Sequence, residues 1–97
     1  MPGVVFHPAA FEELLYARSW YESQAQGLGE RFLEEIERAI DAVQQNPTTW
    51  AAYSQGTRRF LVHRFPFAIV YKYEEQLVTV VAIVHLKRKP DYWQHRT

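Results

Sequence analysis

The chain has 97 residues, of which 47% are hydrophobic, 15% aromatic and 23% charged, a size and composition that predict one globular domain over residues 1–97 and exclude a disordered chain. It contains no cysteine, which excludes a disulfide framework and a thiolate metal site. Its formal net charge of zero argues against a general nucleic-acid binder.

No apolar run approaches the roughly 20 residues that a membrane-spanning helix needs. The N-terminal stretch MPGVVFHPAAF has neither the basic segment nor the long apolar segment of a signal peptide. We therefore expect a cytoplasmic protein without membrane contact. No metal and no cofactor are expected, because the four histidines show no close metal-ligand spacing: His7, His63, His85 and His95.

The first predicted elements are a short strand and two helices. Residues 3–7 (GVVFH) are rich in strand formers, and Pro8 suits the first position of a helix that follows. The glycines in GLG, residues 27–29, end that helix, and a second helix is expected over about 29–45, before Asn46-Pro47. The pair should form an antiparallel hairpin. The predicted stripe of the first helix is Phe11, Leu14, Leu15, Arg18 and Tyr21, and that of the second is Phe32, Ile36, Ile40 and Val43.

Three strands are predicted after a loop at residues 48–56. They cover TRRFLVHRF (57–65), FAIVYKYEE (67–75) and QLVTVVAIVHL (76–86), with turns at Pro66 and at residues 74–76. The last strand is apolar on both alternating faces except at Thr79 and His85, which is typical of a central strand covered on both sides. The predicted fold is α+β, in the order β-α-α-β-β-β, with the helical hairpin packed on a small antiparallel sheet.

Charge is distributed unevenly along the chain. Residues 1–49 carry three Arg and eight acidic residues, a net charge of −5, whereas residues 50–97 carry eight Lys and Arg and three acidic residues, a net charge of +5. The two halves either complement each other within the fold or present a basic face that attracts an anionic partner.

Four segments in this order resemble the RelE/ParE superfamily of toxins from bacterial type II toxin–antitoxin systems, often labelled plasmid stabilisation proteins: WYESQAQGLGERFLEEIERAI, NP, RRFLVHRFPFAIVYKY and VVAIVHLKRKPDYW. The resemblance covers essentially the whole chain and implies the RelE-like fold. It also implies growth inhibition by the free protein and a cognate antitoxin whose C-terminal segment wraps it. RelE-type members cleave mRNA in the ribosomal A site, and ParE-type members poison DNA gyrase.

One departure from the superfamily pattern favours the ParE-like branch. RelE-like ribonucleases typically carry an arginine just before the aliphatic–tyrosine run of the strand that is AIVY here, and the matching position is Ala68, preceded by Phe67. We therefore predict an inhibitor of DNA gyrase that has no chemistry of its own. The alternatives are a RelE-like, ribosome-dependent mRNA endoribonuclease and a toxin-fold protein that has lost toxicity and only binds its partner.

If the protein is a ribonuclease, the candidate catalytic residues are His85, Arg88, Tyr92 and Arg64. Histidine is the natural acid–base group at neutral pH, arginine clamps a phosphate, and a tyrosine donates a hydrogen bond. The alternative for His85 is a histidine at the end of a strand, satisfied by a backbone partner.

For binding of the antitoxin or the target, the candidates are Arg58, Arg59, Arg64, Arg88, Tyr92 and Trp93. The alternative for Arg58 and Arg59 is a solvated strand edge. Trp93 either packs over the core and pins the C-terminal tail or anchors a partner. We expect the basic half to receive an anionic or amphipathic antitoxin segment across the sheet and the hairpin, with strand addition at an exposed edge as one mode.

Overall fold

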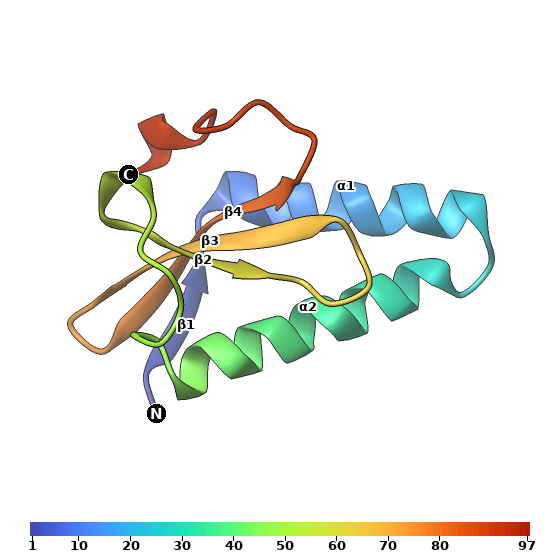
Figure 1. The fold of residues 1–97 in the computed structure, drawn as a ribbon. Coiled ribbons are helices and arrows are strands. Elements are labelled where there is room, and N and C mark those ends of the chain that lie inside the picture. The colour runs from blue at the N-terminus through green and yellow to red at the C-terminus, as the bar shows by residue number, and fades with distance from the viewer.

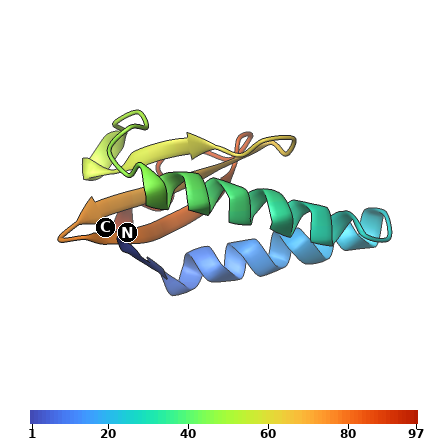
Figure 2. The same cartoon turned by 90° about the horizontal axis from the view of Figure 1, so that it is seen from below.

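A mixed four-stranded sheet and a helical hairpin form the computed structural model, which describes all 97 residues. The elements follow the predicted order: β1 (Gly3–Phe6), α1 (Pro8–Gln24), α2 (Leu28–Gln45), β2 (Arg58–Leu61), β3 (Phe67–Glu74) and β4 (Leu77–His85) (Figure 1). Both helices lie side by side on one face of the sheet (Figure 2). The α+β fold class is confirmed. Neither helix is both long enough and apolar enough to cross a membrane.

The strand order in the sheet is β1-β4-β3-β2. The last three strands are antiparallel, as predicted, but β1 runs parallel to β4, from Gly3 opposite Leu77 to Phe6 opposite Val80. The prediction of a wholly antiparallel sheet therefore needs correction at this edge. Parallel neighbours need a long connection, and here the helical hairpin, β2 and β3 all lie between them in the chain.

The start of α1 agrees with the prediction. Pro8 is the first helical residue, and the Nδ1 atom of His7 accepts a hydrogen bond from the Ala9 N–H group at 3.1 Å. The side chain of His7 thus caps one of the N–H groups that a helix leaves unpaired at its beginning.

The buried face of α1 differs from the predicted stripe. Leu14 is buried, but Phe11 and Leu15 are exposed, and the remaining buried positions are taken by Ala10 and Ala17. Small side chains let the helix lie close to its neighbours, so the packing follows the alanines rather than the largest apolar residues. By contrast, the predicted stripe of α2 is confirmed, with Phe32, Ile36 and Val43 buried and Ile40 partly buried.

The main core lies between the helices and the sheet. At one end it holds an aromatic cluster from α1, α2 and the β2–β3 hairpin, with ring centroids 4.9–6.2 Å apart: Tyr21, Phe32, Phe65 and Phe67. Edge-to-face contacts of this kind add to the burial of the rings themselves.

A bulge in β4 divides that strand into two segments with opposite side-chain phase. Tyr71 pairs with Val80 and Val70 pairs with Ala82, which leaves Val81 without a partner on β3. Because side chains alternate along a strand, the extra residue moves the following odd-numbered side chains, Ile83 among them, to the helix-covered face.

The opposite face of the sheet carries a second, smaller core. It consists of Val70, Val81, Ala82 and Trp93, with Tyr53 and other partly buried side chains packed against it. Since the main core covers the other face of β4, this strand is central and covered on both sides, as predicted.

Candidate binding site

An open groove of about 890 Å³ lies between α1, the end of β4 and the C-terminal tail, residues 86–97. Glu12, Tyr16 and Trp20 of α1 form one wall, and His85 and Arg88 lie on the other side. Tyr16 is 76% exposed and Trp20 is 50% exposed. Aromatic side chains beside an arginine have the composition of an interaction hot spot, so the groove is the candidate site of the molecule.

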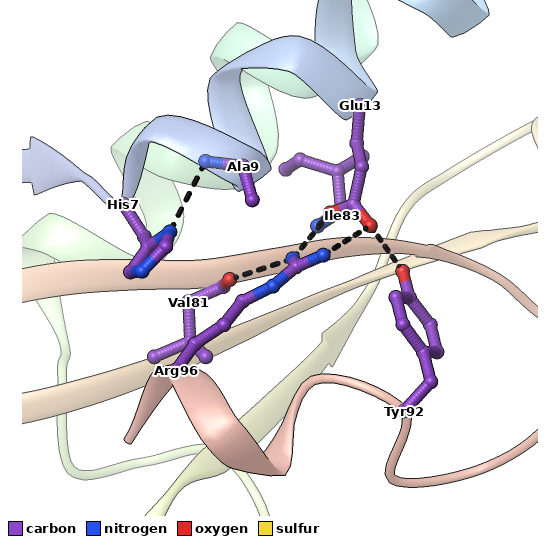
Figure 3. A network of polar contacts seen from close by, with 7 residues as sticks. All are labelled: His7, Ala9, Glu13, Val81, Ile83, Tyr92 and Arg96. Atoms are coloured by element: carbon purple, nitrogen blue, oxygen red, sulfur yellow. Dashed lines mark hydrogen bonds and ion pairs between the residues drawn. The ribbon is translucent and has the colours of Figure 1, made fainter.

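A carboxylate on α1 that lines this groove ties the tail to β4 (Figure 3). Oε1 of Glu13 accepts hydrogen bonds from the Ile83 N–H group at 3.0 Å and from Nη1 of Arg96 at 2.9 Å. Oε2 accepts from the Tyr92 hydroxyl at 2.5 Å and from Nη2 of Arg96 at 3.1 Å. The Glu13 and Arg96 side chains are only 17% and 8% exposed, so this two-point ion pair is largely shielded from water.

Tyr92 is held as a neutral phenol in this network. Burial raises the pKa of its hydroxyl above the ordinary value, and the hydrogen bond to Glu13 and the charge of that carboxylate raise it further. Arg88 lies over the Tyr92 ring, with its guanidinium carbon 4.1 Å from the ring centroid. Tyr92 is therefore a hydrogen-bond donor and a platform for Arg88, and its proton is not available to a base near neutral pH.

His85 lies at the end of β4 and belongs to the groove. Its Nδ1 atom accepts a hydrogen bond from the Lys87 N–H group at 3.0 Å, and its ring packs edge-on against Phe67 at a centroid distance of 5.1 Å. A backbone partner therefore satisfies one nitrogen of the His85 ring at the end of the strand. With Nδ1 accepting, the proton of the neutral ring resides on Nε2.

Arg64 lies apart from the other three ribonuclease candidates. It is in the turn between β2 and β3, where its side chain is 73% exposed and its Nε atom is 4.0 Å from Oε2 of Glu35 on α2. It lines a separate hollow against α2, together with Arg31 and Arg38. The structure thus places His85 and Arg88 at one groove, with Tyr92 in contact with Arg88, and places Arg64 at another.

Arg58 and Arg59 project from opposite faces of β2, because side chains alternate along a strand. Nη1 of Arg58 donates a hydrogen bond to the Trp50 carbonyl oxygen at 2.8 Å. The guanidinium carbon of Arg59 lies 5.4 Å from the centroid of the Tyr53 ring. Both arginines have partners within the chain and are partly buried, and they do not form one continuous basic patch.

Trp93 is 1% exposed and belongs to the second core, where its ring lies 5.8 Å from that of Tyr53. It pins the tail to the sheet, which was one of its two predicted roles. In this structure its ring presents no surface to a partner.

Glu13, Arg96 and Tyr16 belong to the groove but were not among the predicted site residues. Glu13 and Arg96 are 83 positions apart, and no local pattern links them. For Tyr16 a usable signal existed, because it lies four positions before Trp20 and therefore shares one helix face with it. The histidines and carboxylates form no group of three that could hold a metal ion.

Comparisons with known proteins agree with the resemblance. The sequence profile of the family described as "ParE toxin of type II toxin-antitoxin system, parDE" matches residues 4–90. No curated protein sequence matches the chain. Among solved structures, a chromosomal ParDE toxin–antitoxin system from P. aeruginosa has a chain that is similar with a TM-score of 0.73 and 17% identity, over 90% of this chain and 98% of that chain.

The isolated E. coli RelE toxin is similar with a TM-score of 0.60 and 12% identity, over 98% of this chain and 95% of that chain. At such identities these structures establish the fold, which is RelE-like, whereas the family profile covers most of the sequence. The predicted membership of the RelE/ParE superfamily is confirmed. The chain belongs to the ParE toxin family of type II toxin–antitoxin systems.

Proposed function

We propose that this protein inhibits DNA gyrase by binding to it and that a cognate antitoxin neutralises the inhibition. Membership of the ParE family implies a toxin and a cognate antitoxin. The choice of gyrase follows from the resemblance to ParE-type members, and the choice of binding over catalysis is inferred from the residues of the site.

The observation that carries this proposal is the environment of Ala68. This residue is 1% exposed and lies in β3 between Leu61 on β2 and Val84 on β4. It occupies the position at which the resemblance to RelE-like ribonucleases calls for an arginine. A methyl group supplies neither a positive charge for a scissile phosphate nor a proton for a leaving oxygen, both of which RNA cleavage requires.

The groups that remain near the groove favour recognition over proton transfer. Tyr92 is a neutral phenol bonded to Glu13, and Nδ1 of His85 is bonded to a backbone N–H group. Tyr16, Trp20 and Arg88 offer the aromatic and guanidinium surface that dominates many protein interfaces. We propose this groove as the surface that contacts gyrase.

The antitoxin is proposed to use the sheet edge and the helical hairpin. The first part of the outer edge of β2 is already covered, because Ala52 bridges to Arg58 and the Arg59 N–H group donates to the Ala51 carbonyl oxygen at 3.1 Å. Leu61, farther along this edge strand, is 57% exposed. An extended antitoxin segment would therefore pair along the Phe60–Leu61 part of β2.

Induced expression with separate measurements of DNA synthesis and protein synthesis tests the target. We expect DNA synthesis to stop first, and the purified protein to inhibit supercoiling by gyrase until the antitoxin is added. If protein synthesis stops first and mRNA is cut in the ribosomal A site, the ribonuclease alternative is correct. If both processes continue, the non-toxic binding alternative is correct.

A further inference from the structure

The edge of β4 is only partly covered by its neighbouring strand. β1 pairs with β4 from Leu77 to Val80, and the His7 N–H group donates to the Val80 carbonyl oxygen at 2.9 Å before the chain enters α1. Past this point β1 no longer provides backbone partners on that side. Unpaired backbone groups in a half-buried strand are costly, so another part of the chain has to satisfy them.

Side chains take over this role. Nη1 of Arg96 donates to the Val81 carbonyl oxygen at 3.1 Å, and the Ile83 N–H group donates to Glu13 at 3.0 Å. Glu13 and Arg96 are also paired with each other, so one ion pair serves two backbone groups of β4. The tail is thereby attached to the open part of the strand edge by polar contacts (Figure 3).

The same carboxylate holds the ring on which one groove residue, Arg88, rests. Glu13 accepts the hydrogen bond of the Tyr92 hydroxyl, and the ring of Tyr92 is the surface on which Arg88 rests, at 4.1 Å. The guanidinium carbon of Arg96 lies 5.3 Å from the centroid of that ring. A change at Glu13 therefore reaches Arg88 through Tyr92.

Trp93 provides a second and independent anchor for the tail. Its indole is buried against Val70, Val81 and Ala82 in the second core, whereas Glu13 belongs to α1, which packs on the other face of the sheet. Loss of the Glu13 carboxylate leaves this apolar anchor in place. Trp93 thus attaches the tail to the sheet, whereas Glu13 orients Tyr92 and, through it, Arg88.

We infer that Glu13 is a positioning residue of the target-binding surface, which fixes the Tyr92 ring and so presents Arg88 at the rim of the groove. This inference rests on the proposed function in one respect, namely that the groove contacts gyrase. The partner surface that fits such a rim is an acidic or carbonyl-rich segment, because a guanidinium held over a ring still directs its N–H donors outward.

Nuclear magnetic resonance of the full chain tests the positioning directly. A ring current shifts the side-chain protons of Arg88 upfield while they lie over Tyr92, and a Tyr92→Leu variant identifies that shift by abolishing it. We expect the shift to decrease in Glu13→Gln, and also in Tyr92→Phe, which keeps the ring but loses the hydroxyl. The exposed Glu37 on α2 provides a matched control, and Glu37→Gln should keep the full shift.

Titration of the tyrosines adds a second signature. Removal of the Glu13 charge should lower the pKa of Tyr92, because that carboxylate contributes to raising it. The Tyr92→Phe variant identifies which step of the absorbance titration belongs to this residue. If Glu13→Gln fails to fold, Tyr92→Phe still reports on the position of Arg88.

The consequence for function is measured as inhibition of gyrase supercoiling. We expect Glu13→Gln to weaken inhibition by at least about tenfold, which corresponds to roughly 1.4 kcal/mol of binding, with Glu37→Gln unchanged. If Arg88 keeps its shift in both Glu13→Gln and Tyr92→Phe, the positioning role is wrong. The same holds if the shift is lost and inhibition is undiminished.

Failure of the proposed function would look different. In that case the wild-type protein itself does not inhibit gyrase, while the resonance comparison still decides whether Glu13 sets the position of Arg88.

Discussion

Gly29, in the first turn of α2, lies so close to Arg18 of α1 that an added Cβ atom would be 2.7 Å from the Arg18 carbonyl oxygen. The two helices can pack this closely only because Gly29 has no side chain. The obstructing atom belongs to the backbone of α1, so it cannot move aside as the end of a flexible side chain would.

Gly29→Ala should therefore destabilise the protein by about 1–3 kcal/mol, the usual cost of forcing an extra methyl group into a packed contact. Chemical denaturation measures the change. Gly3→Ala is the matched control, because a Cβ atom at Gly3 would make an ordinary 3.5 Å contact with Leu77. Equal stability of the two variants would show that the helices can separate at no cost.

The turn between the helices predicts a dependence of stability on acid pH. The carboxylate of Glu22 accepts hydrogen bonds from the Gly27 and Gly29 N–H groups at 3.0 Å each, and these bonds lower the pKa of Glu22 below its ordinary value. A lowered pKa in the folded state contributes stability that is present above the unfolded pKa and is lost as pH falls through the folded pKa.

We expect wild-type protein to lose more stability than Glu22→Gln as the pH falls from about 5 to 3. The measurement is the denaturant midpoint of both proteins at several pH values, compared as a difference so that other carboxylates cancel. Parallel curves for the two proteins would contradict this role of Glu22.

Trp93→Ala should destabilise the protein by about 3–5 kcal/mol, because it removes the largest fully buried side chain and leaves a cavity against the sheet. Thermal unfolding followed by circular dichroism is the measurement. If the melting temperature does not change, the tail is not held by this ring and the second core contributes little.

Arg88→Ala should leave the melting temperature nearly unchanged and weaken gyrase inhibition. Arg88 is exposed, and a cation resting on a ring at an exposed site contributes only about 0.5–1 kcal/mol. Retained binding of the antitoxin, measured by calorimetry, shows that the fold is intact. Full inhibition by a stable Arg88→Ala protein would remove Arg88 from the target surface.

Charge reversal at Arg59 tests where the antitoxin binds. Arg59→Glu should slow association at low salt and reduce the dependence of the rate on salt, because rim charges act mainly on the encounter rate. Arg58 is less suitable for this experiment, since its guanidinium is bonded to the Trp50 carbonyl oxygen and its loss would disturb the loop. An unchanged association rate at low salt would place the antitoxin elsewhere.

The order of elements could be predicted from the sequence because each element carries a local signal. Pro8 begins α1, the glycines around residue 28 separate the helices, and Pro66 marks a turn between strands. The direction of β1 carries no such signal, since it depends on where a strand more than 70 positions away is placed. The residue pattern of a four-residue strand does not distinguish parallel from antiparallel pairing.

The candidate site was predictable only in part. The tail residues Arg88, Tyr92 and Trp93 were found because they cluster in the sequence. Trp93 is a buried anchor, whereas Tyr92 supports Arg88 at the groove. These different roles depend on Glu13 and on the second core, which come from distant segments of the chain. The burial of Ala10 and Ala17 in α1 was not predicted, because these residues stabilise the packing by letting the helix lie close to its neighbours and not by burying large side chains.

The single extra residue at Val81 determines on which face of the sheet each side chain at the end of β4 lies. Without it, a uniform alternation would turn Ile83 and His85 toward the layer that holds Trp93 and would direct Ala82 and Val84 toward α1. Ile83 and His85 would then no longer line the groove. Val81 does not line that groove, yet the extra residue that it adds to β4 decides on which face of the sheet Ile83 and His85 lie.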